Sequence, residues 1–190
     1  MDILYLGPSC AKILNYLNSD GNQVTRTEQG IMFGQDLLSN KGVLVSYGYR
    51  HVISREIIRS FPNKIINLHI SYLPWNRGAD PNLWSFLENT PAGVTIHYMD
   101  EGIDTGDIIA QEKLFFSPDE TLRSTYDMLT KTIEKLFIQI WPDFIRGNIV
   151  ALPQQKEIGS FHNSRDKKSF EYLLTDGWET PIANLIGKAL

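Results

Sequence analysis

Residues 65–78 read Ile65-Ile66-Asn67-Leu68-His69-Ile70-Ser71-Tyr72-Leu73-Pro74-Trp75-Asn76-Arg77-Gly78. The stretch begins as an apolar strand. Side chains alternate across a strand, so Asn67 and His69 project from one face and Leu68 from the other. A buried parallel strand is normally almost all aliphatic, and polar groups near its carboxyl end are costly unless they are partnered or used. Ligands bind at that end in open α/β sheets, so the stretch predicts a strand and a site together.

A second stretch, at residues 100–107, reads Asp100-Glu101-Gly102-Ile103-Asp104-Thr105-Gly106-Asp107. It joins two predicted strands, over 93–99 and 108–112. Such a loop can supply the carboxylate that stabilises and orients an imidazolium. An imidazole can take up a proton, and an amide can donate to a developing oxyanion. Asn67, His69 and Asp104 are therefore candidates for acyl transfer, although each alone also fits a structural role as a hydrogen-bonded or turn residue.

The composition favours one globular domain of 190 residues, with 42% hydrophobic and 11% aromatic residues. The formal net charge is −4 with both signs scattered, which argues against a nucleic-acid partner. No apolar run approaches the roughly 20 residues of a membrane span, and the N-terminus lacks a signal-peptide pattern. With a single cysteine, Cys10, no internal disulfide can form, and we expect a cytoplasmic protein.

Apolar runs and turn residues predict the other elements. Strands are expected over 3–6, 23–27 and 43–47, and helices over 10–17 (capped by Ser9), around 34–39, after Ser54, and from Asp80-Pro81 to 87. The segment 117–120 predicts the start of a long helix that Pro142 kinks or breaks and Gly147 ends. Strands alternating with helices favour an α/β, Rossmann-like fold with a mostly parallel sheet flanked by helices.

The long predicted helix and the segment after it bear on domains and assembly. We expect a catalytic domain over 1–150 and a short C-terminal extension over 151–190 that packs on it. The apolar residues Phe137, Trp141 and Phe144 fit either a homodimer surface or core packing.

The first motif, Asn67-Leu68-His69 followed by residues 71–78, resembles the signature of the folate-dependent formyltransferases. The loop at 100–107 is similar to the second motif of that family. The resemblance implies a formyltransferase core, 10-formyltetrahydrofolate as co-substrate and no metal. It also implies that Asn67, His69 and Asp104 form the catalytic set.

The resemblance further implies where the ligands lie. The pterin is expected between the loop after the 43–47 strand and the loop at 99–104, with much of the contact made by backbone. The expected folate-binding residues are Tyr47, Arg50, His51, Val52, Met99, Asp100 and Asp104. The expected acceptor-binding residues are Ser9, Trp75, Asn76 and Arg77.

The sequences of residues 73–85 and 159–166 are similar to those found in sugar-nucleotide N-formyltransferases and in the formylation domains of peptide synthetases. The expected acceptor is a nucleotide-linked amino sugar, with no nucleic acid and no membrane as partner. Alternatives are an aminoacyl group on a carrier protein and a folate-binding module without turnover. A metal site built from His51, His69, His97 and the acidic loop has no supporting H-x-x-x-H or C-x-x-C spacing.

Overall fold

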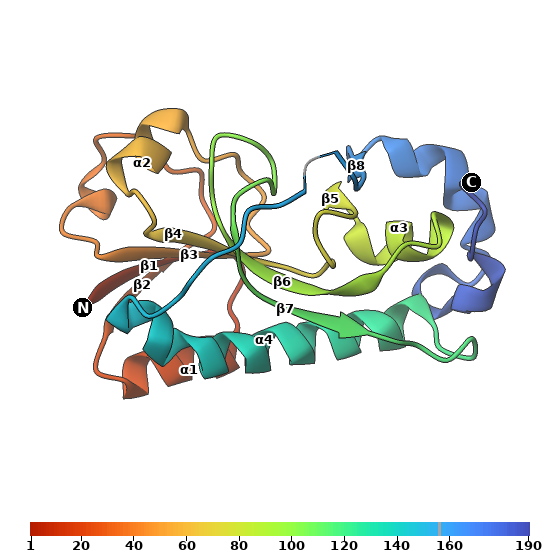
Figure 1. Ribbon diagram of the computed structural model, residues 1–190, viewed down its shortest axis with the longest axis horizontal. Helices are drawn as coiled ribbons and strands as arrows, with labels where there is room; N and C mark the ends of the chain where they lie inside the picture. Colours follow the sequence, from red (N-terminus) through yellow and green to blue (C-terminus); the bar gives the residue numbers. More distant parts are fainter. Residues whose placement is uncertain (156) are drawn as a thin grey trace.

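The computed structural model describes residues 1–155 and 157–190, and a six-stranded sheet forms its centre (Figure 1). From edge to edge the strands are β2 (Gln23–Thr27), β1 (Asp2–Leu6), β3 (Val43–Tyr47), β4 (Ile65–His69), β6 (Ala92–Tyr98) and β7 (Ile108–Leu114). The first four strands are parallel, β6 is antiparallel to β4, and β7 is antiparallel to β6. The predicted α/β class, with a mostly parallel sheet flanked by helices, is confirmed.

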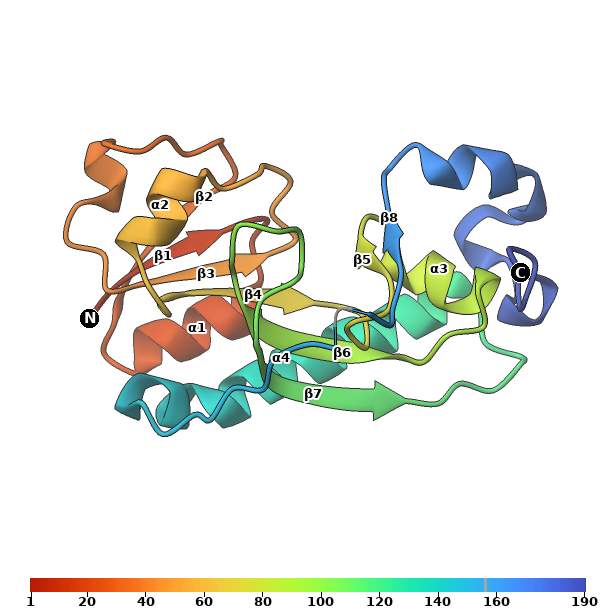
Figure 2. The same cartoon turned by 45° about the horizontal axis from the view of Figure 1, so that its top comes forward.

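Helices cover both faces of this sheet (Figures 1 and 2). One face carries α1 (Ala11–Ser19) and α4 (Leu122–Arg146), and the other carries α2 (Arg55–Ser60) and the 3-10 turn η1 (Asp36–Leu38). Strand β5 (Arg77–Gly78) pairs in parallel with β8 (Phe161–His162) in a second, small sheet. Helix α3 (Pro81–Leu87) comes directly after β5 in the chain. The remaining 3-10 helices are η2 (Asp166–Leu173), η3 (Gly177–Glu179) and η4 (Ile182–Asn184). Within the described ranges, no helix combines the length and the apolar composition that crossing a bilayer requires.

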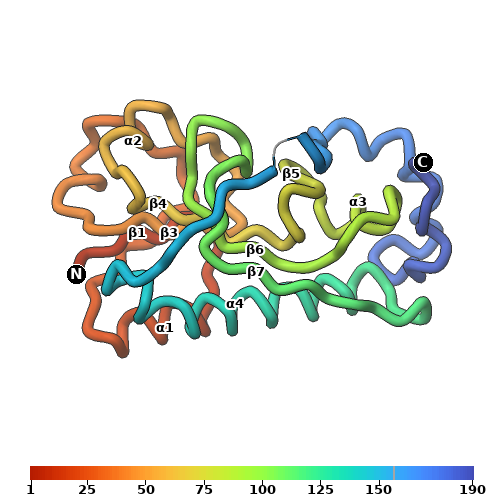
Figure 3. Tube along the Cα trace, in the orientation of Figure 1, coloured from red at the N-terminus to blue at the C-terminus, as the bar shows by residue number. Residues whose placement is uncertain are grey.

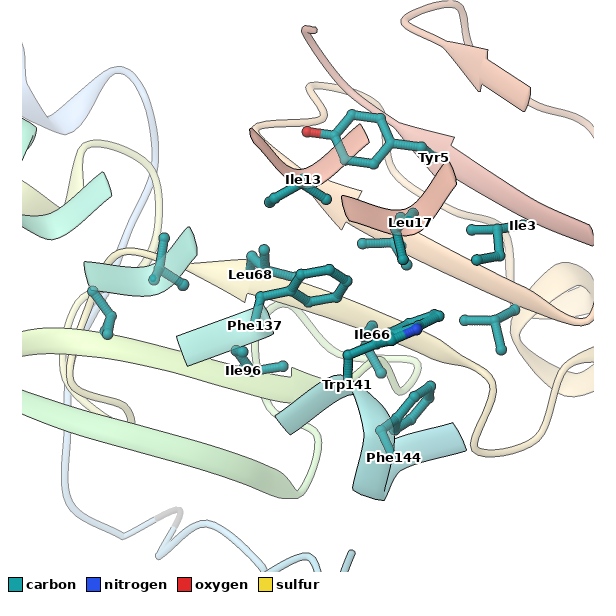
Figure 4. Close-up of a cluster of buried hydrophobic side chains, with 14 of the residues drawn as sticks. Ile3, Tyr5, Ile13, Leu17, Ile66, Leu68, Ile96, Phe137, Trp141 and Phe144 are labelled. Atoms are coloured by element: carbon teal, nitrogen blue, oxygen red, sulfur yellow. The ribbon is translucent and has the colours of Figure 1, made fainter. Parts of the chain in front are cut away.

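The larger core lies between the sheet and the helices α1 and α4 (Figure 4). Alternate strand residues point into it, and helix residues at intervals of three or four meet them. Its buried members include Ile3, Tyr5, Ile13, Leu17, Ile66, Leu68, Ile96, Phe137, Trp141 and Phe144. Each such side chain contributes about 1.5–3 kcal/mol by leaving water. Core packing therefore accounts for Phe137, Trp141 and Phe144, the three residues for which a homodimer surface was the alternative.

Two predicted helix starts are wrong by a few residues. Helix α4 is capped by Thr121 and not by Ser117, and Thr121 and Ser124 form a reciprocal capping box. Thr121 is held in an extended conformation because it forms an isolated antiparallel β-bridge with Pro181, which lies 60 residues later in the chain. Helix α1 is capped by Cys10 and not by Ser9, without a side-chain hydrogen bond.

The predicted break at Pro142 is also wrong, because α4 continues through it to Arg146 and ends at Gly147 in the left-handed conformation. Proline removes one backbone donor, and this cost is small here because Pro142 lies on the exposed side of the helix, where water can hydrate the freed carbonyl.

The chain after residue 150 returns across the sheet toward β5 (Figure 3). Leu152 bridges Ile108 at the start of β7, and β8 then pairs with β5. The division into 1–150 and 151–190 stays a prediction, but the later segment supplies hydrogen-bond partners to the loops described next.

Candidate active site

Asn67 and His69 lie at the carboxyl end of β4, on the sheet face opposite α4. Their strand neighbours Ile66 and Leu68 point into the α4 core, so the alternation expected from the sequence turns the two polar side chains the other way. His69 is 7% exposed, and Asn67 is partly exposed. The polar pair therefore sits at the end of a buried strand with one side toward solvent.

Asp104 reaches this pair from the loop between β6 and β7. Its Oδ1 accepts a hydrogen bond from Asn67 Nδ2 at 3.0 Å, and its Oδ2 lies 3.7 Å from His69 Nδ1. The same Oδ2 accepts from the backbone amide of Gly78 at 2.9 Å. Asn67 and His69 at the end of β4 and Asp104 from the loop between β6 and β7 thus converge, as the hypothesis of a joint site requires.

The loop that presents Asp104 depends on a close approach at Gly106. A Cβ atom there would lie 1.9 Å from the carbonyl oxygen of Tyr98, a distance that no side chain tolerates. Gln154 secures the loop from the far side, because its Nε2 donates to the carbonyl of Asp104 at 2.9 Å and to that of Gly106 at 2.7 Å. No local pattern could have indicated the role of Gln154, because its partners lie 50 and 48 residues earlier in the chain.

The orientation of His69 is fixed by a backbone acceptor. Its Nε2 lies 3.1 Å from the carbonyl oxygen of Asn76, so Nε2 carries a proton and donates it there. The other nitrogen, Nδ1, faces the Asp104 carboxylate. A charge on this ring is balanced by the carboxylate beside it.

A second imidazole, His97 on β6, completes the cluster. It stands directly opposite Asn67 in the antiparallel pair of β4 and β6, and its side chain is 1% exposed. Its Nε2 lies 3.3 Å from Asn67 Nδ2 and 3.5 Å from Asp104 Oδ1. Sequence reasoning considered His97 only for a metal site, although its place near the end of a predicted strand before the acidic loop was a usable signal.

The surroundings of Asp104 favour its ionised form. Burial by itself would raise the pKa of this carboxyl, but the charge of the His69 ring, the hydrogen bond and charge of His97 and the Gly78 amide outweigh it. Together they hold the pKa of Asp104 well below its ordinary value. The site therefore contains a permanent anion between two imidazoles.

The loop after β4 is held by the side chain of Asn76. This side chain is fully buried, and its Nδ2 donates to the hydroxyls of Ser85 and Thr90. Its Oδ1 accepts from Ser160 in the C-terminal segment. Every polar atom of the side chain is thus used internally, and the side chain shapes the loop whose carbonyl orients His69. Contact of Asn76 with an acceptor stays a prediction, and it would come from the backbone of this residue.

The other expected acceptor residues lie at the surface or on its edge. Ser9 is exposed after β1, Trp75 is partly exposed, and Arg77 lines a cavity of about 310 Å³ with Ile103 and Thr105. This cavity adjoins the residues that flank Gly78 and Asp104 in the chain. Contact of these side chains with an acceptor stays a prediction.

The expected folate residues fall into two groups. Arg50, His51 and Val52 are exposed in the loop after β3, and Met99 and Asp100 follow β6. One carboxylate oxygen of Asp100 already has partners, because its Oδ1 accepts hydrogen bonds from the Gly102 amide and the Thr105 hydroxyl. Tyr47 packs its ring against the α4 core, and burial raises its pKa above the ordinary value. Any contact of Tyr47 with a ligand on the Asn67 face would therefore come from its backbone.

The arrangement can do proton and oxyanion chemistry without a covalent intermediate. It offers an amide donor, an imidazole whose Nδ1 faces a carboxylate, and that carboxylate to balance a positive charge on the ring. Among residues 1–155 and 157–190, no group of three or more His, Cys, Asp or Glu side chains is arranged to hold a metal ion. His51 lies apart, against the ring of Tyr49.

Comparison with known proteins gives a consistent result. Residues 27–140 match the family model described as formyl transferase. A solved structure of the formyltransferase PseJ from Anoxybacillus kamchatkensis is 50% identical over the whole of both chains, with a TM-score of 0.98. That protein was solved in complex with UDP-4,6-dideoxy-4-formamido-L-AltNAc and tetrahydrofolate. A 4-N formyltransferase from Francisella tularensis shares the fold, with 23% identity, a TM-score of 0.77, and 88% of this chain and 78% of that one covered.

The curated relatives include methionyl-tRNA formyltransferases. The methionyl-tRNA formyltransferase of Listeria monocytogenes serotype 4a (strain HCC23) is 33% identical over 133 residues, which cover 68% of this chain and 43% of the relative. The match covers less than half the length of these curated relatives.

Proposed function

Because the chain belongs to the formyl transferase family, we propose that it is an N-formyltransferase that acts on the primary amine of a nucleotide-linked amino sugar. The formyl donor in this proposal is 10-formyltetrahydrofolate. The observation that carries the proposal is the convergence of Asn67, His69 and Asp104 at one strand end. The full-length similarity to PseJ supports the choice of acceptor class.

The proposed reaction is direct acyl transfer. The neutral amine attacks the formyl carbon, a carbon–nitrogen bond to the amine forms, and the bond from the formyl carbon to the folate nitrogen breaks. One proton leaves the amine and one is gained by the departing folate nitrogen, so the reaction needs no other reactant. The chain must therefore hold an oxyanion and carry one proton between two nitrogens.

His69 is the proton carrier in this proposal. Its Nε2–H is fixed on the carbonyl of Asn76, so Nδ1 is the nitrogen that receives the proton of the amine and returns it to the leaving group. Asp104 lies 3.7 Å from Nδ1 and stabilises the imidazolium while the proton is held. The low pKa of Asp104 keeps the carboxylate from taking that proton itself.

Asn67 supplies an uncharged donor to the oxyanion. Removal of such a donor costs about 10²–10³ in rate in other acyl-transfer sites. In the present structure both protons of Asn67 Nδ2 have partners, Asp104 Oδ1 at 3.0 Å and His97 Nε2 at 3.3 Å. We infer that the longer of these two hydrogen bonds, to His97, breaks when the oxyanion forms, so that this proton of Asn67 is donated to the oxyanion.

The methionyl-tRNA formyltransferases give a second candidate acceptor, methionyl-tRNA. The charge of the chain weighs against it, because a net charge of −4 without a basic stripe offers little to a polyanion. An aminoacyl group on a carrier protein is a third candidate, and a folate-binding module without turnover is the non-enzymatic one.

The test is a formyl-transfer assay with purified chain and 10-formyltetrahydrofolate. The acceptors are UDP-, dTDP- and GDP-linked amino sugars, methionyl-tRNA and an aminoacyl carrier protein, and the product is identified by mass spectrometry. We expect formamide formation with an amino-sugar nucleotide, and its loss in His69→Ala and Asn67→Ala. Turnover with methionyl-tRNA or the carrier protein alone would contradict the proposed acceptor, and unchanged turnover in His69→Ala would contradict the role of His69.

A further inference from the structure

His162 of β8 is buried against α3, and the proton and oxyanion chemistry described above makes no use of it. Strands β5 and β8 lie beside α3 (Figures 1 and 2). We propose that His162 is a positioning residue: its side chain anchors β8 to α3, and β8 holds the backbone that orients His69 and Asp104. The inference rests on the proposed function and adds to it the support of these two side chains.

The side chain of His162 contacts α3 at two points. Its ring lies flat on the indole of Trp84, with ring centroids 3.7 Å apart and an interplanar angle of 4°. Its Nε2 lies 3.3 Å from Oε1 of Glu88, the residue that caps the carboxyl end of α3. A protonated imidazole in this place is attracted by the face of the indole and by the carboxylate together. The side chain therefore ties β8 both to the side and to the end of α3.

The buried Nε2 indicates that the His162 ring does more than fill space. Among residues 1–155 and 157–190, no group meets this nitrogen with the alignment of a hydrogen bond, although the carboxylate of Glu88 lies near it. A buried polar atom of this kind costs free energy that an apolar side chain of similar size would avoid. What the imidazole adds over such a side chain is its attraction to Glu88, and this attraction draws β8 to the end of α3.

The backbone of β8 holds β5 and the residues around it. The carbonyl oxygen of His162 accepts from the amide of Ala79 at 2.9 Å, and that of Ser160 accepts from the amide of Arg77 at 3.0 Å. The hydroxyl oxygen of Ser160 accepts from the amide of Asn76 at 3.1 Å. Three amides within four residues are thus fixed by the segment that His162 anchors.

The same four residues contact both titratable side chains of the site. The Gly78 amide lies between the two that bond to β8, points the other way, and donates to Asp104 Oδ2 at 2.9 Å. The carbonyl of Asn76 lies 3.1 Å from Nε2 of His69. A shift of β8 therefore moves the donor to the carboxylate and the acceptor of the imidazole at once.

Steady-state kinetics of three variants test the proposal on the intact chain. We expect His162→Ala to lower kcat by about ten- to hundredfold, because a catalytic group is misplaced, and to leave the KM of the amino-sugar nucleotide and of 10-formyltetrahydrofolate within about twofold of wild type. His162→Phe keeps a ring on Trp84 and should recover part of kcat. Glu88→Gln removes the charge without removing a packed atom, and it should lower kcat several-fold.

Two control variants separate positioning from a loss of stability or of charge. Ile13→Val trims a fully buried side chain of α1, under the other face of the sheet. It should lower the midpoint of thermal unfolding and leave kcat unchanged. Glu112→Gln removes an exposed carboxylate on β7 and should change neither.

Amide hydrogen exchange followed by NMR tests the anchor without any substrate. In His162→Ala the amides of Gly78 and Ala79 should exchange about tenfold or more faster than in wild type, in excess of any change at the amides of β1. Glu88→Gln should give a smaller increase at the same two amides, and it decides the question if His162→Ala does not fold. Wild-type exchange at both amides in the folded variants would overturn the anchor.

The anchor and the proposed function fail in different ways. If exchange at Gly78 and Ala79 responds as expected but wild type formylates no amino-sugar nucleotide, the anchor stands and the proposed function is wrong. If amino sugars are formylated and kcat is the same in wild type, His162→Ala and Glu88→Gln, the function stands and the positioning role is wrong.

Discussion

Asn67 and His97 face each other across β4 and β6, with Asn67 Nδ2 3.3 Å from His97 Nε2. The other nitrogen of the His97 ring lies 2.7 Å from the carbonyl of Tyr98, so Nδ1 must carry a proton. In its neutral form the His97 ring accepts at Nε2 and takes one of the two Asn67 protons, while Asp104 takes the other. In its charged form the same Nε2 donates toward Asp104 Oδ1, 3.5 Å away. The neutral ring thereby fixes the amide with its nitrogen toward the carboxylate.

We therefore expect His97→Leu to lower kcat by about ten- to hundredfold, less than the loss of the oxyanion donor itself. The KM for the folate should change little, because His97 is buried and does not face solvent. His97→Gln, which retains a polar group opposite Asn67, should recover part of the activity. A fall in thermal stability with kcat unchanged in His97→Leu would show that the residue only fills space.

The Asp104 carboxylate predicts a pH dependence of stability. Its pKa in the folded protein lies below its unfolded value of about 3.9, so its stabilising effect is complete above that value and is lost as the pH falls below it. We expect Asp104→Asn to unfold with about 1–3 kcal/mol less free energy at neutral pH, and this difference to shrink below about pH 4. Urea unfolding from pH 7 to pH 3 measures it.

The control for this prediction is Asp107→Asn, which changes an exposed carboxylate on the same loop. Its unfolding free energy should follow that of wild type at each pH. A difference between wild type and Asp104→Asn that stays constant down to pH 3 would contradict the assignment of a stabilising charge to Asp104.

Much of the site follows from local sequence rules, and the rest does not. Alternation along one strand places Asn67 and His69 together, and the glycines around Asp104 indicate a loop that can return to them. The place of His97 in the site could not be predicted in this way. The alternation of β6 shows which of its residues share a face of the sheet, but it does not show which strand lies beside β6. The pairing of β4 with β6 is set by the tertiary structure and not by the local sequence.

The helix starts show the same limit. Residues 117–120 and Thr121 each carry capping signals, and the choice between them is made by Pro181, which holds Thr121 extended. The burial of the Asn76 side chain could not be predicted for a related reason. An asparagine in a loop beside a site is an ordinary ligand contact, and only the approach of Ser160, 84 residues later, shows that it is buried.

The small sheet of β5 and β8 gives a prediction about Gly78. Its φ is +87°, and a Cβ atom there would lie 2.4 Å from the carbonyl oxygen of His162. Gly78→Ala must push β8 away and move the amide that holds Asp104. We expect turnover to fall by about 10²-fold, the cost of misplacing a catalytic group by about 1 Å. Gly42→Ala, whose Cβ would have no neighbour closer than 3.5 Å, should behave as wild type.

The C-terminal segment is expected to act on catalysis through Gln154. This side chain is buried and donates to two backbone carbonyls of the loop that carries Asp104. Gln154→Glu has nearly the same shape but cannot donate when ionised, so it leaves both carbonyls unpaired and brings a charge toward them. We expect a loss of about 1–3 kcal/mol in unfolding free energy and a lower kcat. Faster hydrogen exchange at residues 102–106 should accompany both, whereas Gln155→Glu, an exposed neighbour, should change neither. Wild-type exchange and turnover in Gln154→Glu would mean that the loop keeps its place without the C-terminal segment.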